Sequence, residues 1–534
     1  MRKFDARLWT GGWALLACLF AGAMYAMQKG QDAAWDLKNY HLYNAWAFLH
    51  DRSSDLTAAG LQGFFNPLLD VPYFWLGTGW LHGCPRLLSG FQGLWYGATV
   101  FVVLRIAARF AEMRGRPFGY VDLLAVAVGI TGTMVVSQTG SSTNEVPLAL
   151  LVMLGFYVLL PIAAPATFGA LRRAFAAGLL CGLAAGLKPT AVVYTPALGA
   201  ALWLACGGRM AAFKACTVFV SAAFFAFLLA YGWWGWRLYQ LTGNPVFPLF
   251  NQVFHSSWVA AVGGTDRQFM PKDLGQWLFY PFYWMHRNAY QGGNTFADSR
   301  YAVAMIGAAM LAVTVCTRRA RQAAGAPSVR FLLLFVVFSY LLWLNLYSIL
   351  RYAVSIEVLT GFVILFALQE ALAAARGTEP KLCVIWAMSA LTVLMLAFTR
   401  YTDWGHAPYA AVAFDVQPPQ IAPGATVLIL GQPNAYVAPF FASAASIRFI
   451  GITWLNNGAE RFHLGELTRE LVTGHAGPLY AITRDANGQD QAQLLRILPS
   501  SHLSDCQPIE TAMERTLRGT DLSDGLRLCQ VTQI

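Results

Sequence analysis

Charged residues are scarce in this chain of 534 residues, because Asp, Glu, Lys and Arg together make up only 12% of it. A soluble protein would carry about a quarter charged residues. Hydrophobic residues account for 57%, and apolar runs of about 20 residues recur as far as residue 399. The composition therefore excludes an ordinary soluble protein and predicts an α-helical polytopic membrane protein.

The sequence also lacks several signatures of cofactor and nucleic-acid binding. None of its nine cysteines stands at a spacing typical of a zinc site. The turn "LGQPNA" lacks the glycine spacing that surrounds a phosphate with backbone amides. The net charge of +10 comes from basic residues in short loops between apolar runs, which indicates membrane orientation and not nucleic-acid binding.

The lysines and arginines predict how the chain crosses the membrane. Arg2, Lys3 and Arg7 precede the first apolar run, which we expect to be a retained span with a cytoplasmic N-terminus. The later clusters of basic residues fall in every second loop, as expected if these loops are cytoplasmic. The pattern predicts eleven spans, near residues 8–28, 86–104, 121–138, 146–164, 173–188, 190–206, 212–233, 300–317, 331–348, 353–372 and 381–398.

One further apolar stretch, residues 64–81, would add a crossing that the loop charges do not allow. Asn66, Pro67 and Asp70 interrupt it, so we expect a re-entrant or juxtamembrane segment on the outer side. The outer side then contains the loops 29–85 and 234–299 of a transmembrane domain that spans residues 1–399.

Residues 400–534 differ in character from the rest of the chain. Short strand-like runs such as "GATVLILG" and "LRLCQVTQI" alternate with polar, helix-like stretches, which predicts a small soluble extracytoplasmic α/β domain. Cys506 and Cys529 are its two cysteines, and an oxidising compartment would allow them to pair.

Polar residues at the edge of a bilayer are costly, and in this chain they concentrate on the predicted outer side. Carboxylates in early loops face cations in later ones, as a site for a phosphorylated substrate requires. Each also has a structural explanation, such as helix capping by Asp36 or snorkelling by Lys188. The candidate residues are Asp36, Lys38, Tyr40, His41, Asp70, Glu145, Lys188, His255, Arg300 and Arg351.

This plan resembles the GT-C superfamily of integral membrane glycosyltransferases. The stretch "WDLKNYHLYNAWAFLHDR" is similar to the segment after the first span of polyprenol-phosphate-mannose-dependent mannosyltransferases, whose loop Asp is the proposed base. The matching residue here is Asp36. The stretch "SQTGSSTNE" is similar in placement to an acidic turn of oligosaccharyltransferase catalytic subunits, but Asn144–Glu145 replaces its acidic pair, which weakens the case for a metal.

The resemblance implies an inverting transfer of a sugar from a polyprenyl-phosphate donor to a glycan, lipid or protein acceptor. Asp36 would be the catalytic base, and the other candidate residues would bind substrate. A monophosphate leaving group leaves no pyrophosphate for a metal to bridge, so no cofactor is required, although a divalent metal is possible. Resemblance of "FFNPLLDVPYF" and "GNPVFPLFN" to bacterial membrane proteins implies a bacterial source. With the loop charges, it leads us to expect the site at the outer face of the inner membrane.

Two other classes of function fit the composition. A transporter or flippase of a lipid-linked sugar would show internal repeats and ionisable residues deep in its spans, and we find no convincing repeat. A non-catalytic sensor or assembly protein would need no convergence of acidic and basic groups from separate loops. The distinguishing property is whether Asp36 lies beside these cations.

Overall fold

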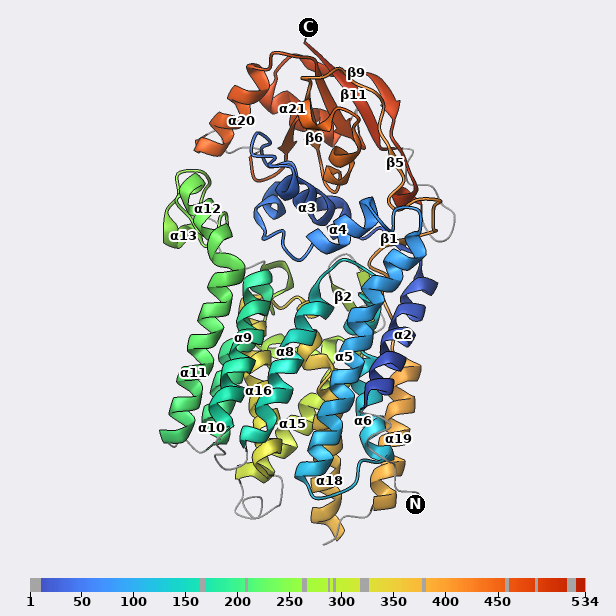
Figure 1. Ribbon diagram of the computed structural model, residues 1–534, viewed down its shortest axis with the longest axis vertical. Coiled ribbons are helices and arrows are strands. Elements are labelled where there is room, and N and C mark those ends of the chain that lie inside the picture. The colour runs from blue at the N-terminus through green and yellow to red at the C-terminus, as the bar shows by residue number, and fades with distance from the viewer. Residues whose placement is uncertain are drawn as a thin grey trace.

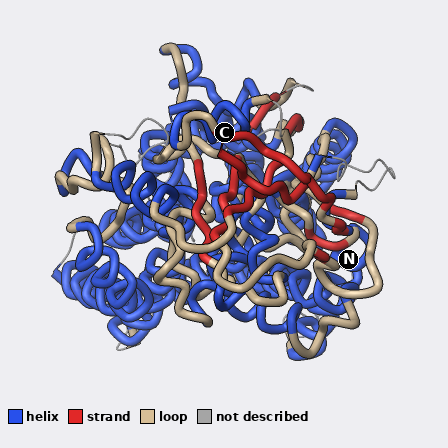
Figure 2. The backbone as a smooth tube through the Cα atoms, turned by 90° about the horizontal axis from the view of Figure 1, so that it is seen from above, coloured by secondary structure: helices blue, strands red, loops and turns tan. Residues whose placement is uncertain are grey.

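The computed structural model describes residues 11–163, 169–206, 210–261, 267–286, 289–291, 294–316, 326–376, 381–456, 461–485, 488–515 and 525–533. Figure 1 shows a bundle of long helices at one end of the molecule and a sheet at the other, with α3 (Leu42–Leu49) and α4 (Val71–Thr78) between them. Figure 2, viewed from the sheet end, shows the strands crossing above part of the bundle.

The helical bundle is formed by segments that are apolar in sequence. Its helices are α2 (Gly12–Lys29), α5 (Pro85–Met113), α6 (Tyr120–Ile130), α7 (Thr133–Ser137), α8 (Glu145–Leu159), α9 (Ala170–Leu187), α10 (Tyr194–Ala205), α11 (Met210–Phe227), α15 (Arg300–Cys316), α16 (Ala326–Leu346), α17 (Val354–Glu357), α18 (Thr360–Arg376) and α19 (Lys381–Phe398). On the outer side, α12 (Trp233–Thr242), α13 (Asn251–Phe254), α14 (Leu274–Tyr283) and the hairpin β2 (Ala289–Gln291) and β3 (Asn294–Phe296) follow α11.

Each of the eleven predicted spans contains a helix, but the helices differ in length. Five are long and apolar enough to cross a membrane among the described residues, or six if the pair bent by 50° at α17 and α18 forms one broken span. Four shorter apolar helices of 10–17 residues include α6 and α8. The protein is therefore a helical membrane protein, and the count of eleven crossings stays a prediction.

The segment 64–81 contains no helix of membrane-spanning length. Its one α-helix, α4, has eight residues and begins directly after Asp70. At 1.5 Å per residue, such a helix is about 12 Å long, well short of the hydrocarbon thickness.

Small residues bring the first two long helices into close contact. A Cβ atom on Gly22 of α2 would lie 2.4 Å from the carbonyl oxygen of Gly93 on α5, and one on Gly97 would lie 2.3 Å from the carbonyl oxygen of Cys18. No larger residue fits at this crossing, which is how small residues promote helix packing in a membrane. This contact fixes the start of the first outer loop beside α5.

The outer end of the molecule is built around a five-stranded mixed sheet in the order β7-β6-β8-β11-β9. β6 pairs in parallel with β7 and β8, and β11 pairs antiparallel with β8 and β9. A disulfide joins Cys506 to Cys529 across β9 and β11. The elements are β6 (Thr426–Leu430), β7 (Arg448–Ile452), α20 (His463–Thr473), β8 (Leu479–Thr483), α21 (Gln489–Ile497), β9 (Ser501–Pro508) and β11 (Arg527–Gln533).

The first outer loop packs into this C-terminal region. β1 (Gln31–Asp32) pairs with β4 (His406–Ala407), as β5 (Val416–Gln417) pairs with β10 (Glu510–Thr511). Leu56 forms a parallel bridge with Ile450 at the edge of β7. One hydrophobic core contains residues of both regions, including Leu37, Tyr40, Trp46, Tyr436, Phe449 and Leu528. The predicted boundary at residue 400 therefore divides a shared core.

We expect residues 400–534, produced alone, not to form a well-packed domain, because the loop residues that complete the core would be missing. The isolated fragment should lack near-ultraviolet circular dichroism and show poor amide chemical-shift dispersion. As the matched control, residues 29–85 joined to 400–534 by a flexible linker should recover both signals. A dispersed spectrum from the fragment alone would contradict the shared core.

Candidate active site

Asp36 lies at the start of a π-helical turn, Leu37–His41, that leads into α3. Its backbone is helical and its side chain makes no capping hydrogen bond, so capping does not explain this carboxylate. The Oδ2 atom instead accepts a hydrogen bond from Nη1 of Arg351 at 2.7 Å. Asp36 is only 5% exposed. The carboxylate is thus buried and held by a cation from a distant part of the chain.

Arg351 comes from the short helical turn Leu350–Ala353 that precedes the bent pair α17 and α18. Its guanidinium lies 5.3 Å from the ring centre of Tyr352 and 5.7 Å from that of Trp404. Stacking on two aromatic faces is favourable for a guanidinium and orients its donors. The side-chain amide of Gln138 donates to the Arg351 carbonyl at 3.3 Å.

The charges around Asp36 determine its protonation. Burial acts to raise the pKa of this carboxyl, but the charges of Arg351, His41 and Lys188 together outweigh burial and hold it below its usual value. Asp36 is therefore an anion at neutral pH. Three groups able to carry positive charge converge on one carboxylate.

A second buried ion pair lies next to the first. Nζ of Lys188, in the break between α9 and α10, lies 2.6 Å from Oε1 of Glu145 and 2.9 Å from the Thr143 carbonyl oxygen. Glu145 is the first residue of α8. Its other oxygen, Oε2, is buried and has no hydrogen-bond partner in the described structure.

His41 and Asp70 form a third contact in the same region. Nδ1 of His41 lies 2.7 Å from Oδ1 of Asp70, and the Asn144 amide donates to that oxygen at 2.6 Å. The rings of Tyr40 and His41 contact each other with their centres 4.0 Å apart and their planes tilted by 39°. Burial raises the pKa of Tyr40 well above its usual value, and the carboxylates of Asp36, Glu145 and Asp70 raise it further.

These contacts bring together eight residues from five separate segments. The structure unites seven of the ten candidate residues, and Asn144, named in the sequence only as a departure from a related turn, completes the set. We refer to the cluster as the Asp36 site, and its members are Asp36, Tyr40, His41, Asp70, Asn144, Glu145, Lys188 and Arg351, with Tyr40 contributing its ring.

Three predicted substrate-binding residues lie elsewhere. Lys38 points to Glu514 of the C-terminal region, at 3.4 Å, where Arg484 also binds. His255 is exposed at the end of α13. Arg300 is fully buried against Asp298, with Nε to Oδ1 at 2.7 Å. None of the three has a described contact with Asp36.

Arg300, Asp298 and Glu357 form a separate cluster, which supports the turn that carries Asn144. Asp298 accepts a hydrogen bond from the Thr133 amide, and Glu357 accepts from the amides of Met134 and Val135. Two carboxylates thereby occupy the N-terminus of α7, the favourable end for negative charge. Sequence reasoning missed Asp298 and Glu357, because nothing local distinguishes them from other carboxylates near apolar runs.

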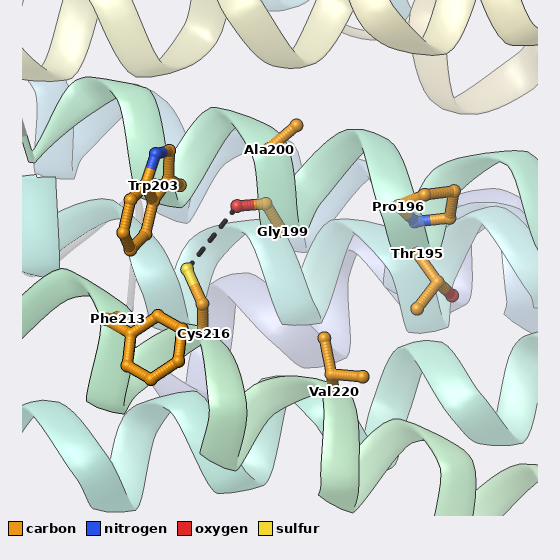
Figure 3. Close-up of a pocket in the computed structure, with 8 residues that line it drawn as sticks. All are labelled: Thr195, Pro196, Gly199, Ala200, Trp203, Phe213, Cys216 and Val220. Carbon is orange, nitrogen blue, oxygen red and sulfur yellow. Dashed lines mark hydrogen bonds between the residues drawn. The ribbon is translucent and has the colours of Figure 1, made fainter. Parts of the chain in front are cut away.

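Two cavities of more than 400 Å³ lie among the described residues, and Asp36 lines neither of them. One of about 440 Å³ lies between α3 and α12 and is lined by Tyr43, Asn44, Phe65, Trp234 and Arg237 among others. A second, of about 480 Å³, lies between α10 and α11 and is lined by the residues drawn in Figure 3, whose polar contact is a hydrogen bond from Cys216 Sγ to the Gly199 carbonyl. Its lining is apolar and suits a lipid chain.

The described residues contain no group of three or more His, Cys, Asp or Glu side chains placed to hold a metal ion. The carboxylates of the Asp36 site face Arg351, Lys188 and His41 in separate pairs.

The fold, with long helices at one end and a sheet-containing region at the other, is similar to that of a solved structure. This is the single-particle cryo-EM structure of the arabinofuranosyltransferase AftD from mycobacteria, similar with a TM-score of 0.51 and 12% identity. The alignment covers 100% of this chain and 40% of that one, so the chain spans less than half of its length. No protein-family model and no curated protein sequence matches.

The buried pair at Asp36 predicts a pH-dependent contribution to stability. Asp36→Asn should cost about 3–5 kcal/mol at neutral pH, because Arg351 stays buried without its anion. Since the folded pKa of Asp36 is lowered, the wild-type carboxylate stabilises the fold at pH values above its unfolded pKa of about 3.9. That contribution disappears as the pH falls through the lowered value.

The unfolding temperature of purified wild type should therefore exceed that of Asp36→Asn by a constant margin above about pH 5, and the margin should shrink below about pH 4. Thermal unfolding followed by intrinsic fluorescence between pH 7 and pH 3 measures this difference. A margin that stays constant to pH 3 would show that Asp36 is not ionised in the folded protein.

Proposed function

We propose that the protein is an inverting glycosyltransferase that moves a sugar from a polyprenyl-phosphate donor to an acceptor at the outer face of the bacterial inner membrane. The observation that carries the proposal is the convergence on buried Asp36 of Arg351, Lys188 and His41 from separate segments. The membrane glycosyltransferase fold supports it.

The proposed reaction requires a general base and a binding site for the phosphate. Asp36, ionised at neutral pH, accepts the proton of an acceptor hydroxyl as its oxygen attacks the anomeric carbon. Arg351 and Lys188 neutralise the phosphate that leaves from the opposite side, which inverts the anomeric centre. The phosphate cannot enter hydrocarbon, so it binds at the outer edge of the bundle, where both cations lie.

Donor binding also activates the base. In this structure Arg351 pairs with Asp36, and Lys188 pairs with Glu145. A bound phosphate competes with both carboxylates for these cations. Arg351 that turns toward phosphate leaves Asp36 with less positive charge beside it, which makes the carboxylate a better proton acceptor.

Asp36→Asn should insert normally and lose sugar transfer by about 10²-fold or more, because the amide cannot accept a proton. Proteoliposomes supplied with radiolabelled polyprenyl-phosphate sugars, beginning with the arabinofuranosyl form that the AftD likeness suggests, provide the assay. Release of polyprenyl phosphate reports turnover when water replaces the acceptor.

Asp51→Asn is the matched control, since Asp51 lies in the same loop but is 80% exposed. It should leave transfer unchanged. Full activity of Asp36→Asn would remove Asp36 as base, and inactivity of the wild type with every polyprenyl-phosphate sugar would contradict the proposed reaction.

Lys188→Gln should weaken binding of polyprenyl monophosphate by about tenfold or more, because a charge-assisted contact to phosphate is lost. Exposed Lys272 serves as the control, and Lys272→Gln should bind as the wild type does. Quenching of intrinsic tryptophan fluorescence, to which Trp404 beside Arg351 contributes, measures binding. Equal affinity of wild type and Lys188→Gln would place the phosphate elsewhere.

A further inference from the structure

The π-helical turn Leu37–His41 places His41 on the same side of the chain as Asp36. The two residues are five positions apart, and with 3.6 residues per turn an α-helix would direct them to different sides. The backbone amide of Leu42 bonds to the Leu37 carbonyl, the wider i to i+5 spacing of a π-helix. This winding explains how His41 contributes to the charge around Asp36.

His41 is held in one orientation by neighbours from other segments. Asp70, just before α4, binds Nδ1 at 2.7 Å and is itself held by the amide of Asn144 at 2.6 Å. That amide also lies 3.4 Å from Nδ1. The close contact with the Tyr40 ring restricts the rotation of the His41 ring. A carboxylate that fixes Nδ1 leaves Nε2 as the ring atom available for chemistry.

The Nε2 atom of His41 is buried and has no hydrogen-bond partner in the described structure, and the same is true of Glu145 Oε2. His41 is 2% exposed. Leaving such an atom without a partner costs free energy, and native structures rarely do so without a reason. A ligand that enters the site would supply the missing partner.

We propose that His41 is the general acid of this site and donates the Nε2 proton to the leaving phosphate oxygen. This assignment rests on the proposed function. A bond forms between the acceptor oxygen and the anomeric carbon while the bond from that carbon to the phosphate oxygen breaks, and its electron pair stays on phosphate. Asp36 takes the hydroxyl proton, His41 supplies one to phosphate, and exchange with water resets both.

The role of acid follows from the neighbours of His41. Protonated His41 forms an ion pair with Asp70, and Asp36 is the second carboxylate that faces it. The other charged groups are Arg351 and Lys188, each already paired with a carboxylate. Because Asp36 is the anion suited to accept a proton, the reaction needs a donor for the other side of the bond. The raised pKa of Tyr40 makes its hydroxyl a poor proton donor, and His41, with Nε2 unpartnered, is the donor that the site offers.

The test is the pH dependence of turnover in proteoliposomes. His41→Gln keeps a hydrogen-bond donor but has no proton to give, so kcat should fall by about 10²-fold or more. The wild type should lose kcat/KM as the pH rises and His41 loses its proton, and this alkaline limb should be absent in His41→Gln. Asp70→Asn removes the carboxylate bonded to Nδ1 of His41, so its alkaline limb should differ from that of the wild type.

His50→Gln is the matched control, since His50 ends α3 and bonds only to the Trp46 carbonyl in the same helix. His50→Gln should match the wild type in kcat and in the pH dependence of kcat/KM. Binding of polyprenyl monophosphate verifies that each variant is folded. If His41→Gln fails to bind, the alkaline limb of the Asp70→Asn pH profile tests the assignment of His41 as acid.

Three outcomes contradict the assignment. An unchanged kcat in His41→Gln, or an unmoved limb in Asp70→Asn, overturns His41 as acid while leaving the glycosyltransferase intact. A limb lost on the acid side would make His41 a base. Failure of the wild type to turn over any polyprenyl-phosphate sugar overturns the proposed reaction and this assignment with it.

Discussion

The buried ion pair between Asp36 and Arg351 joins the two halves of the molecule, and the remaining contacts of the site depend on it. Asp36 belongs to the first outer loop, and Arg351 to a break in the late helices of the bundle. Neither charge could stay buried alone, because desolvation of an unpaired ion costs several kcal/mol. The pair therefore links the first loop to the bundle, and the contact of His41 with Asp70 lies beside it.

Several local features of the structure support this ion pair. Two glycines bring α2 against α5, where the first loop begins, and a π-helical turn brings Asp36 and His41 to one side. Asp298 and Glu357 anchor α7 below the turn that carries Asn144. The geometry of the Asp36 site thus rests also on residues outside the site itself.

Much of this arrangement could be predicted from the sequence, since the cost of polar groups near a bilayer is visible in composition. Asp36, His41, Asp70, Glu145, Lys188 and Arg351 were selected because each is a polar residue beside an apolar run. The same rule misplaced Lys38 and Arg300, which are also polar and near apolar runs but have partners elsewhere in the Glu514 and Asp298 contacts. Whether such a residue belongs to the Asp36 site depends on its partner, which can lie hundreds of residues away in the chain. No local pattern in a single sequence identifies that partner. Trp404 and Tyr352 were missed for the same reason.

The shared core of the first outer loop and the C-terminal region has a consequence for synthesis. Gln31 pairs with Ala407, and Leu56 with Ile450, so the earliest exported segment meets its partners only after nearly the whole chain has been made. Until then the loop carries Asp36 without Arg351 and leaves apolar side chains such as Leu37 without a core. Packing of the first loop is therefore a late event in the making of the chain, and a chain halted before the C-terminal region would leave the loop without its core.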